Sequence, residues 1–107
     1  MQIQCHAAST ARPGLRAAAV ARTSRTLRRL QRLVTQVVVD LGDVNGSRGG
    51  VDKQCRVRVA SPGLAPVVVT ARAERWAHAL DRALERAVQA LLSRRARARR
   101  YIASAVT

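Results

Sequence analysis

Four short stretches of the chain have either an alternation of hydrophobic and polar residues or a short β-branched apolar run, the patterns typical of strands. Residues 1–5 alternate weakly, and residues 35–41 are β-branched and apolar. In residues 51–60, Cys55, Val57 and Val59 share one face, while Arg56 and Arg58 share the other. Residues 66–72 follow the turn sequence SPGLAP, so the last two strands are predicted to form an antiparallel hairpin.

Two longer stretches have the period of an α-helix instead. The first is predicted over residues 12–32, with Ser9 or Thr10 as the N-cap and Pro13 in the first turn. Its apolar positions are Leu15, Ala19, Thr23, Leu27, Leu30 and Val34. The second is predicted from residue 73 onward, with apolar positions Trp76, Leu80, Ala83, Leu84, Ala87, Val88 and Leu91.

The order of elements is therefore βαβββα, which predicts an α+β fold with a four-stranded mixed sheet and two helices packed on one face. The other sheet face is left open to a partner. At 107 residues the chain has room for one core. We expect residues 1–93 to form a single α+β domain. Residues 94–107 are expected to extend the last helix as a basic segment that frays.

Charge changes this picture from a plain small domain to one that needs a polyanionic partner. Twenty Lys and Arg residues stand against six acids, for a formal net charge of +14. Both halves of the chain are basic, so the charge covers the whole fold. Nearly all the cations are arginines, which suit phosphate, although a GC-rich genome would produce the same preference.

The candidate RNA-binding residues fall into three groups. In the first helix, five arginines without interleaved acids lie away from the apolar stripe, and an ordinary solvated face is the competing interpretation. For the second helix, Glu74, Asp81 and Glu85 could simply balance the nearby arginines. The full set is Arg22, Arg25, Arg28, Arg29 and Arg32; Lys53, Arg56 and Arg58; and Arg75, Arg82, Arg86, Arg94 and Arg95.

Catalytic and metal chemistry find little support in the sequence. Cys5 and Cys55 lack the spacing of a zinc site and are interpreted as small buried apolar residues. His6 and His78 have no nucleophile or carboxylate at a spacing that specifies a triad. The glycine-rich VNGSRGG leads into a strand and lacks a P-loop ending, so it is interpreted as a strand connection. We therefore expect no enzyme activity, no metal and no cofactor.

Aromatic content and targeting signals narrow the class further. Trp76 and Tyr101 are the only aromatic residues, and Trp76 is interpreted as a core anchor. This scarcity favours recognition of folded RNA by phosphate and shape over base stacking on a sheet. No apolar run is long enough to span a membrane and no secretory signal is evident. The acid-free residues 1–39 also resemble an organellar transit peptide, but their predicted helix covers the sheet, which favours a structural role.

One family resemblance rests on short motifs in order. These are Asn45-Gly46, Gly49-Gly50, Asp52-Lys53, Cys55, and the helix start from Trp76 to Asp81, read as aromatic-Ala-x-Ala-Leu-Asp. Over about residues 35–94 the chain resembles the bacterial ribosome hibernation-promoting factors, also described as ribosome-associated inhibitors or subunit-interface proteins. It departs from them in using Arg where Lys is usual. It also lacks the C-terminal dimerisation domain of long members, so we expect the short form.

The resemblance implies a non-catalytic cytoplasmic factor that binds small-subunit rRNA in the channel for tRNA and mRNA and keeps idle ribosomes inactive. It implies the small ribosomal subunit as partner, no membrane, no small-molecule substrate and a monomer. Two alternatives remain at this point. One is a general binder of structured RNA or DNA, and the other is a regulatory protein that docks on an acidic protein partner.

Overall fold

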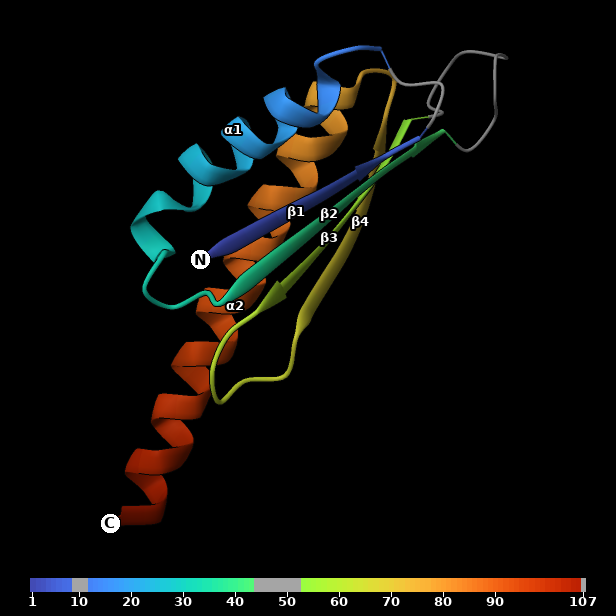
Figure 1. Cartoon of the computed structure of the whole chain (residues 1–107). Coiled ribbons are helices and arrows are strands. Elements are labelled where there is room, and N and C mark those ends of the chain that lie inside the picture. The colour runs from blue at the N-terminus through green and yellow to red at the C-terminus, as the bar shows by residue number, and fades with distance from the viewer. Residues whose placement is uncertain (9–11, 44–52, 107) are drawn as a thin grey trace.

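The structure, a computed structural model, describes residues 1–8, 12–43 and 53–106 (Figure 1). Its elements are β1 (Gln2–Ala7), α1 (Leu15–Leu27), a 3-10 turn η1 (Arg28–Leu30), β2 (Gln36–Asp43), β3 (Lys53–Ala60), β4 (Val67–Ala73) and α2 (Trp76–Val106). This order confirms the predicted α+β fold. The strand bounds differ from the predicted ones by one or two residues, and predicted strand residues 51 and 52 lie outside the described part, as does the glycine-rich connection.

The four described strands form one mixed sheet in the order β1-β2-β3-β4. β1 and β2 are parallel, because α1 carries the chain back between them, and the other two pairs are antiparallel. The register places Cys5, Val39 and Val57 side by side, and Leu41 beside Cys55. Alternation along each strand therefore gives one continuous apolar face, as the sequence pattern predicted.

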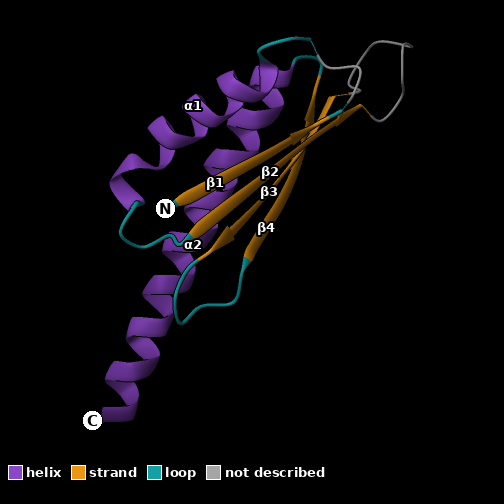
Figure 2. Ribbon diagram, in the orientation of Figure 1, coloured by secondary structure: helices purple, strands orange, loops and turns teal. Residues whose placement is uncertain are grey.

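Both helices cover that apolar face, and the opposite sheet face is left open (Figure 2). α1 packs over β1, while α2 packs over β3 and β4. The core between the layers holds buried side chains from both α-helices and from all four described strands, among them Leu27, Val37, Val57, Leu84 and Leu91. The apolar stripes predicted for both helices are the ones that face the sheet, with Leu30, Trp76 and Val88 only partly buried.

α1 begins later than the sequence pattern suggested. Its N-cap position is Gly14, with φ +85°, and no side chain caps the helix. The predicted caps, Ser9 and Thr10, are too far upstream in the sequence to cap α1. Both residues lie outside the described part of the structure. Glycine adopts this left-handed conformation without the steric cost that a Cβ adds. At the other end, η1 tightens the last turn, so residues 28–32 do not continue α1 as a regular helix.

A tight turn makes the connection between β3 and β4. The Leu64 amide donates to the Ser61 carbonyl at 3.2 Å, with Pro62 and Gly63 as the central residues. Gly63 has φ +77°, which is the conformation that a type II turn requires at its third position. Proline fixes the preceding φ, so the sequence SPGL determines the turn that was predicted here.

α2 runs from Trp76 to Val106 and is longer than the sheet that it covers (Figure 1). At 1.5 Å per residue its length is about 46 Å, against a longest molecular dimension of 57 Å. It begins at Trp76 rather than at residue 73, because Ala73 still pairs with Lys53 at the end of the sheet. The C-terminal part of α2 projects beyond the β3–β4 turn.

Candidate nucleic-acid interface

Four of the five arginines predicted in the first helix are exposed at its end and in the turn that follows. Arg25 lies in the last turn of α1, Arg28 and Arg29 in η1, and Arg32 just beyond it. None of the four makes a side-chain hydrogen bond or ion pair with any residue that the structure describes. We call these four residues the α1 patch. Within the described part of the chain, no carboxylate forms an ion pair with these four cations.

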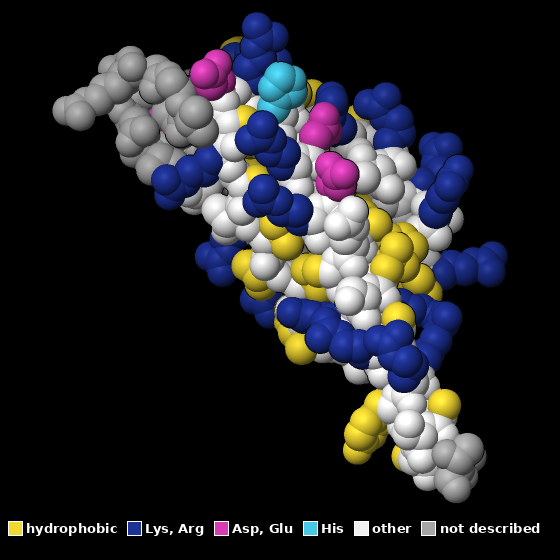
Figure 3. All heavy atoms as spheres, turned by 180° about the vertical axis from the view of Figure 1, so that it is seen from behind, with side chains coloured by type: hydrophobic (Ala, Val, Ile, Leu, Met, Phe, Trp, Pro, Cys, Tyr) yellow, Lys and Arg dark blue, Asp and Glu magenta, His cyan; other side chains and the backbone are white. Residues whose placement is uncertain are grey.

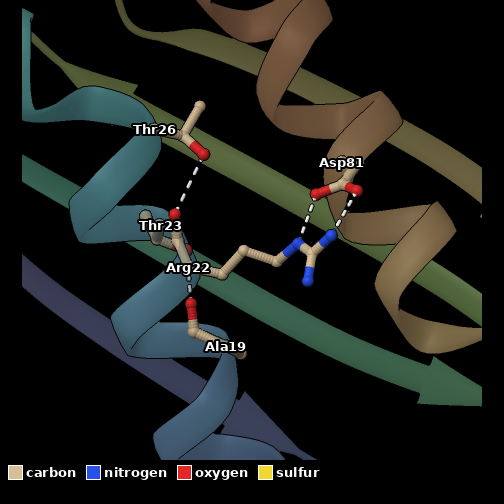
Figure 4. Close-up of polar contacts among 5 residues, drawn as sticks. All are labelled: Ala19, Arg22, Thr23, Thr26 and Asp81. Atoms are coloured by element: carbon tan, nitrogen blue, oxygen red, sulfur yellow. Dashed lines mark hydrogen bonds and ion pairs between the residues drawn. The ribbon is translucent and has the colours of Figure 1, made fainter.

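Arg22 is oriented differently, because it reaches across to α2 (Figure 4). Its Nε and Nη2 donate to Oδ1 and Oδ2 of Asp81 at 2.5 and 2.7 Å, a bidentate pair between residues 59 positions apart. The bond from Arg22 lowers the pKa of Asp81, and burial opposes it. The same pair raises the pKa of Arg22. Its guanidinium therefore joins the two helices, with the side chain still 42% exposed.

The α1 backbone around Arg22 carries two further local bonds. The buried Thr23 hydroxyl donates to the Ala19 carbonyl at 2.8 Å, and the exposed Thr26 hydroxyl donates to the Arg22 carbonyl at 2.9 Å (Figure 4). Thr23 is completely buried, so this bond is what satisfies its hydroxyl inside the apolar layer. A threonine in the predicted apolar stripe is thus accommodated without a buried unpaired polar atom.

The β3 cations separate onto opposite faces of the sheet. Arg56 and Arg58 are exposed on the open face, where Asp40 of β2 lies beside Arg56 in the register. Lys53 lies two residues before Cys55 on β3, so its side chain is on the same, helix-covered face of the sheet. Its Nζ is 2.8 Å from Oδ2 of Asp43 and 5.4 Å from the centre of the Trp76 ring. Lys53 therefore holds the start of α2 against the sheet end, and its side chain is only 25% exposed.

Along α2, two arginines bond to backbone carbonyls rather than to acids. Arg82 Nη1 donates to the Arg72 carbonyl at 3.1 Å. Arg94 Nη1 donates to the carbonyls of Ala65 and Pro66, both at 2.8 Å, which fastens the helix to the β3–β4 turn. Arg75 and Arg86 are exposed, and Arg95 is partly buried. The structure thus does not gather the thirteen predicted residues into one site.

The helix side of the molecule shows how the charges are distributed (Figure 3). Blue Lys and Arg side chains line both flanks of α2, while the acidic side chains gather toward the end away from the protruding tip. Among described acids, Glu74, Asp81 and Glu85 belong to that end of α2 and to the residues just before it. From Arg86 to Val106 the sequence has no acid. Positive potential therefore increases toward the C-terminal end of α2.

No family model and no curated protein matches the sequence. Among solved structures, a ribosomal subunit interface protein from Coxiella burnetii superposes with a TM-score of 0.69, at 18% sequence identity. The match covers 90% of this chain and 99% of that one. The two proteins share a fold. At this identity the likeness establishes the βαβββα architecture over almost the whole of both chains.

The described residues offer little support for a small-molecule, metal or membrane site. A hollow of about 110 Å³ lies between α1 and α2, lined mainly by Leu15, Ala19, Trp76 and Leu80, and it is smaller than the 300–1,000 Å³ usual for ligands. No group of three or more His, Cys, Asp or Glu in the described ranges could hold a metal ion. None of the described helices combines the length and apolar character needed to cross a bilayer.

The two thiols are free and buried, as predicted. Burial raises the pKa of Cys55 to about 12 and also raises that of Cys5. Thiols that remain protonated at neutral pH are poor nucleophiles and poor metal ligands, so packing is their role here.

Sequence reasoning missed six exposed arginines of the described residues: Arg12 just before α1, Arg16 in its first turn, Arg72 on β4, and Arg97, Arg99 and Arg100 on α2. Arg72 lies on the open sheet face and donates from Nε to Oε1 of Gln54 at 3.0 Å. Its position follows from the same alternation that placed Arg56 and Arg58, so the signal was present. Arg97, Arg99 and Arg100 are exposed beyond the core. They belong to the run from which only Arg94 and Arg95 were selected, and counting acids along α2 would have identified them.

Proposed function

We propose that this protein is a ribosome-associated factor that binds rRNA of the small subunit and keeps idle ribosomes inactive. The observation that carries the proposal is the shared fold with a ribosomal subunit interface protein, in a chain with a net charge of +14. The short motifs around Asn45-Gly46 and Trp76 support the same family. Such a factor acts in the cytoplasm, as a monomer and without catalysis, when cells under stress reduce translation.

The α1 patch supplies the main RNA contact in this proposal. Four guanidiniums that no described acid neutralises would repel one another in the free protein, and phosphates would relieve that repulsion. Arginine offers planar bidentate donors that match phosphate oxygens. Arg56 and Arg58 on the open sheet face, with Arg75 and Arg86 at α2, provide further contacts around the same domain. We place the bound domain where tRNA and mRNA otherwise lie, so that its presence blocks both.

Cosedimentation with isolated small ribosomal subunits tests the proposal. Binding should be saturable and should fall steeply between about 50 and 200 mM salt, because each neutralised phosphate releases counterions. Prior loading of the subunits with tRNA and mRNA should prevent it, whereas an unrelated structured RNA should compete poorly.

Two other outcomes would contradict the proposal and identify a different partner. Equal displacement by any structured RNA would indicate a general nucleic-acid binder. A complex recovered from cells that survives RNase treatment and contains no ribosomal subunit would indicate an acidic protein partner.

A further inference from the structure

The C-terminal part of α2 stands clear of the domain that it helps to build. Leu91 is 1% exposed and belongs to the core, whereas Tyr101 and Ile102 are 77% and 63% exposed. Between them, Arg94 fastens the helix to the carbonyls of Ala65 and Pro66. Beyond that anchor, residues 95–106 extend for about 18 Å, and the helix projects past the β3–β4 turn (Figure 1). We call residues 95–106 the C-terminal arm.

The arm carries arginines around most of its circumference. Successive residues are rotated by about 100°, so Arg97 and Arg99 lie about 160° apart, on opposite flanks. Arg100 lies between them on the outer side, and Arg95 follows the flank of Arg99 one turn earlier. These four arginines form no ion pair or side-chain hydrogen bond with any residue that the structure describes. Like charges at these spacings destabilise an isolated helix, so a polyanion is needed to offset them.

The apolar side of the arm is too sparse to dock in a protein groove or on a lipid surface. A helix that binds in an apolar groove presents large anchors at positions i, i+3 or i+4, and i+7. Counting back from Ile102, the equivalent positions hold Ala98 and Arg95. Counting back from Tyr101, they hold Ala98, Arg97 and Arg94. The large apolar residues of the arm are Tyr101, Ile102 and, four positions after Ile102, Val106. They are confined to its last six residues and do not extend to a third anchor at i+7, which a groove-binding helix presents.

We infer that the C-terminal arm is a separate RNA-binding element that inserts into the major groove of an RNA helix opened by a bulge or internal loop. Guanidiniums on opposite flanks match a groove with a phosphate wall on each side. A regular A-form major groove is too narrow for an α-helix about 10–12 Å wide, so an opened groove is required. Tyr101, at the exposed end, is placed to stack on an unpaired base. The Arg94 anchor fixes the direction of the arm relative to the domain.

This inference deepens the proposed function by naming an RNA feature, but its test needs no ribosome. The probe is a short RNA hairpin with a purine bulge, compared with a fully paired hairpin of the same length. Two triple variants with equal charge loss are compared with the wild type: R97Q/R99Q/R100Q in the arm, and R25Q/R28Q/R29Q in the α1 patch. Each lowers the formal net charge from +14 to +11. Circular dichroism verifies that both retain their helix content.

We expect the wild type to bind the bulged hairpin about tenfold or more tightly than the paired one. The arm variant should lose that preference, and its salt dependence on the bulged hairpin should become shallower by about two to three in log–log slope. The patch variant should keep the preference. Equal binding of both hairpins by the wild type, or equal losses in both variants, would overturn the inference.

The outcomes also separate the inference from the proposed function. A preserved hairpin preference without cosedimentation would remove the ribosomal proposal and leave the arm's role standing. Saturable, tRNA-sensitive binding to small subunits without any hairpin preference would do the reverse.

Discussion

Arginines at two neighbouring places along α1 and its following turn differ in their environment. One place is the seam, where Arg22 of α1 meets α2, and the other is the α1 patch. At the seam, Arg22 meets Asp81 in a bidentate pair above the apolar core. In the patch, Arg25 begins a group of four exposed arginines that no described acid contacts. One turn of helix separates Arg22 from Arg25. The difference lies in what the neighbouring element offers, not in the arginines themselves.

This contrast indicates which cations serve the fold and which are available to a partner. Lys53, Arg82 and Arg94 behave like Arg22, because each bonds to an acid or a carbonyl that holds two elements together. The arginines of the α1 patch and of the arm form no such bonds with the described residues. Net charge alone predicts a polyanionic partner. The bonds within the fold then show which cations are already engaged, and these are removed from the candidate RNA contacts.

Charge reversal in the patch should have the largest effect. We expect R25E/R29E/R32E to reduce small-subunit association by about a thousandfold or more, because attraction to phosphate becomes repulsion. The fold should remain cooperative, since all three side chains are exposed. Cosedimentation measures the first effect and thermal unfolding the second. The matched variant R25K/R29K/R32K keeps the charge and should bind, and undiminished binding by the reversed variant would refute the patch as the RNA face.

Truncation of a core side chain beneath the seam should have a large effect on stability, whereas charge reversal in the patch changes binding. Leu84 is completely buried between α2 and the sheet. We expect Leu84→Ala to lower the free energy of unfolding by about 2–5 kcal/mol, through lost burial and the cavity left behind. Leu92→Ala on the same helix, where the side chain is 47% exposed, is the control and should change it by about 0.5 kcal/mol or less. Urea unfolding measures both, and similar losses would contradict the described core.

The same contrast explains how far the sequence could be read. Alternation and helical period were enough for the order of elements, the sheet face and the exposure of Arg25, Arg28, Arg29 and Arg32. These features depend on residues that are close in the sequence, and a periodic pattern records such residues. Lys53 lies two residues before Cys55, so strand alternation already placed its side chain on the helix side of the sheet. Its charge nevertheless favoured the prediction of an RNA role.

The unpredicted features depend on residues far apart in the chain. Arg22 and Asp81 meet because α1 and α2 lie side by side at one rotation about their axes, which no local period determines. Arg94 finds its acceptors in the β3–β4 turn because of where α2 crosses the sheet end. The N-cap of α1 at Gly14 depends on a left-handed backbone conformation that the sequence pattern does not record. Ser9 and Thr10 were predicted instead, because both residue types are favourable N-caps.

Removal of the seam ion pair should have the smallest effect, and it should depend on pH. Both side chains are more than 40% exposed, so solvent screens the pair and Asp81→Asn should cost about 0.2–1 kcal/mol at pH 7. Because Arg22 lowers the pKa of folded Asp81, the stabilisation is fully present above the unfolded pKa of about 4. It is lost as the pH falls through the lower pKa of the folded state.

The wild type and Asp81→Asn should therefore differ in urea unfolding at pH 7 and converge in acid. Glu85→Gln, one turn further along α2, removes an acid that has no described ion pair and provides the control. It should change stability less than Asp81→Asn at pH 7. If the two variants behave alike, long-range charge rather than the bidentate contact stabilises the seam, and Arg22 returns to the set of cations open to RNA. If only Asp81→Asn responds to pH, Arg22 belongs to the fold.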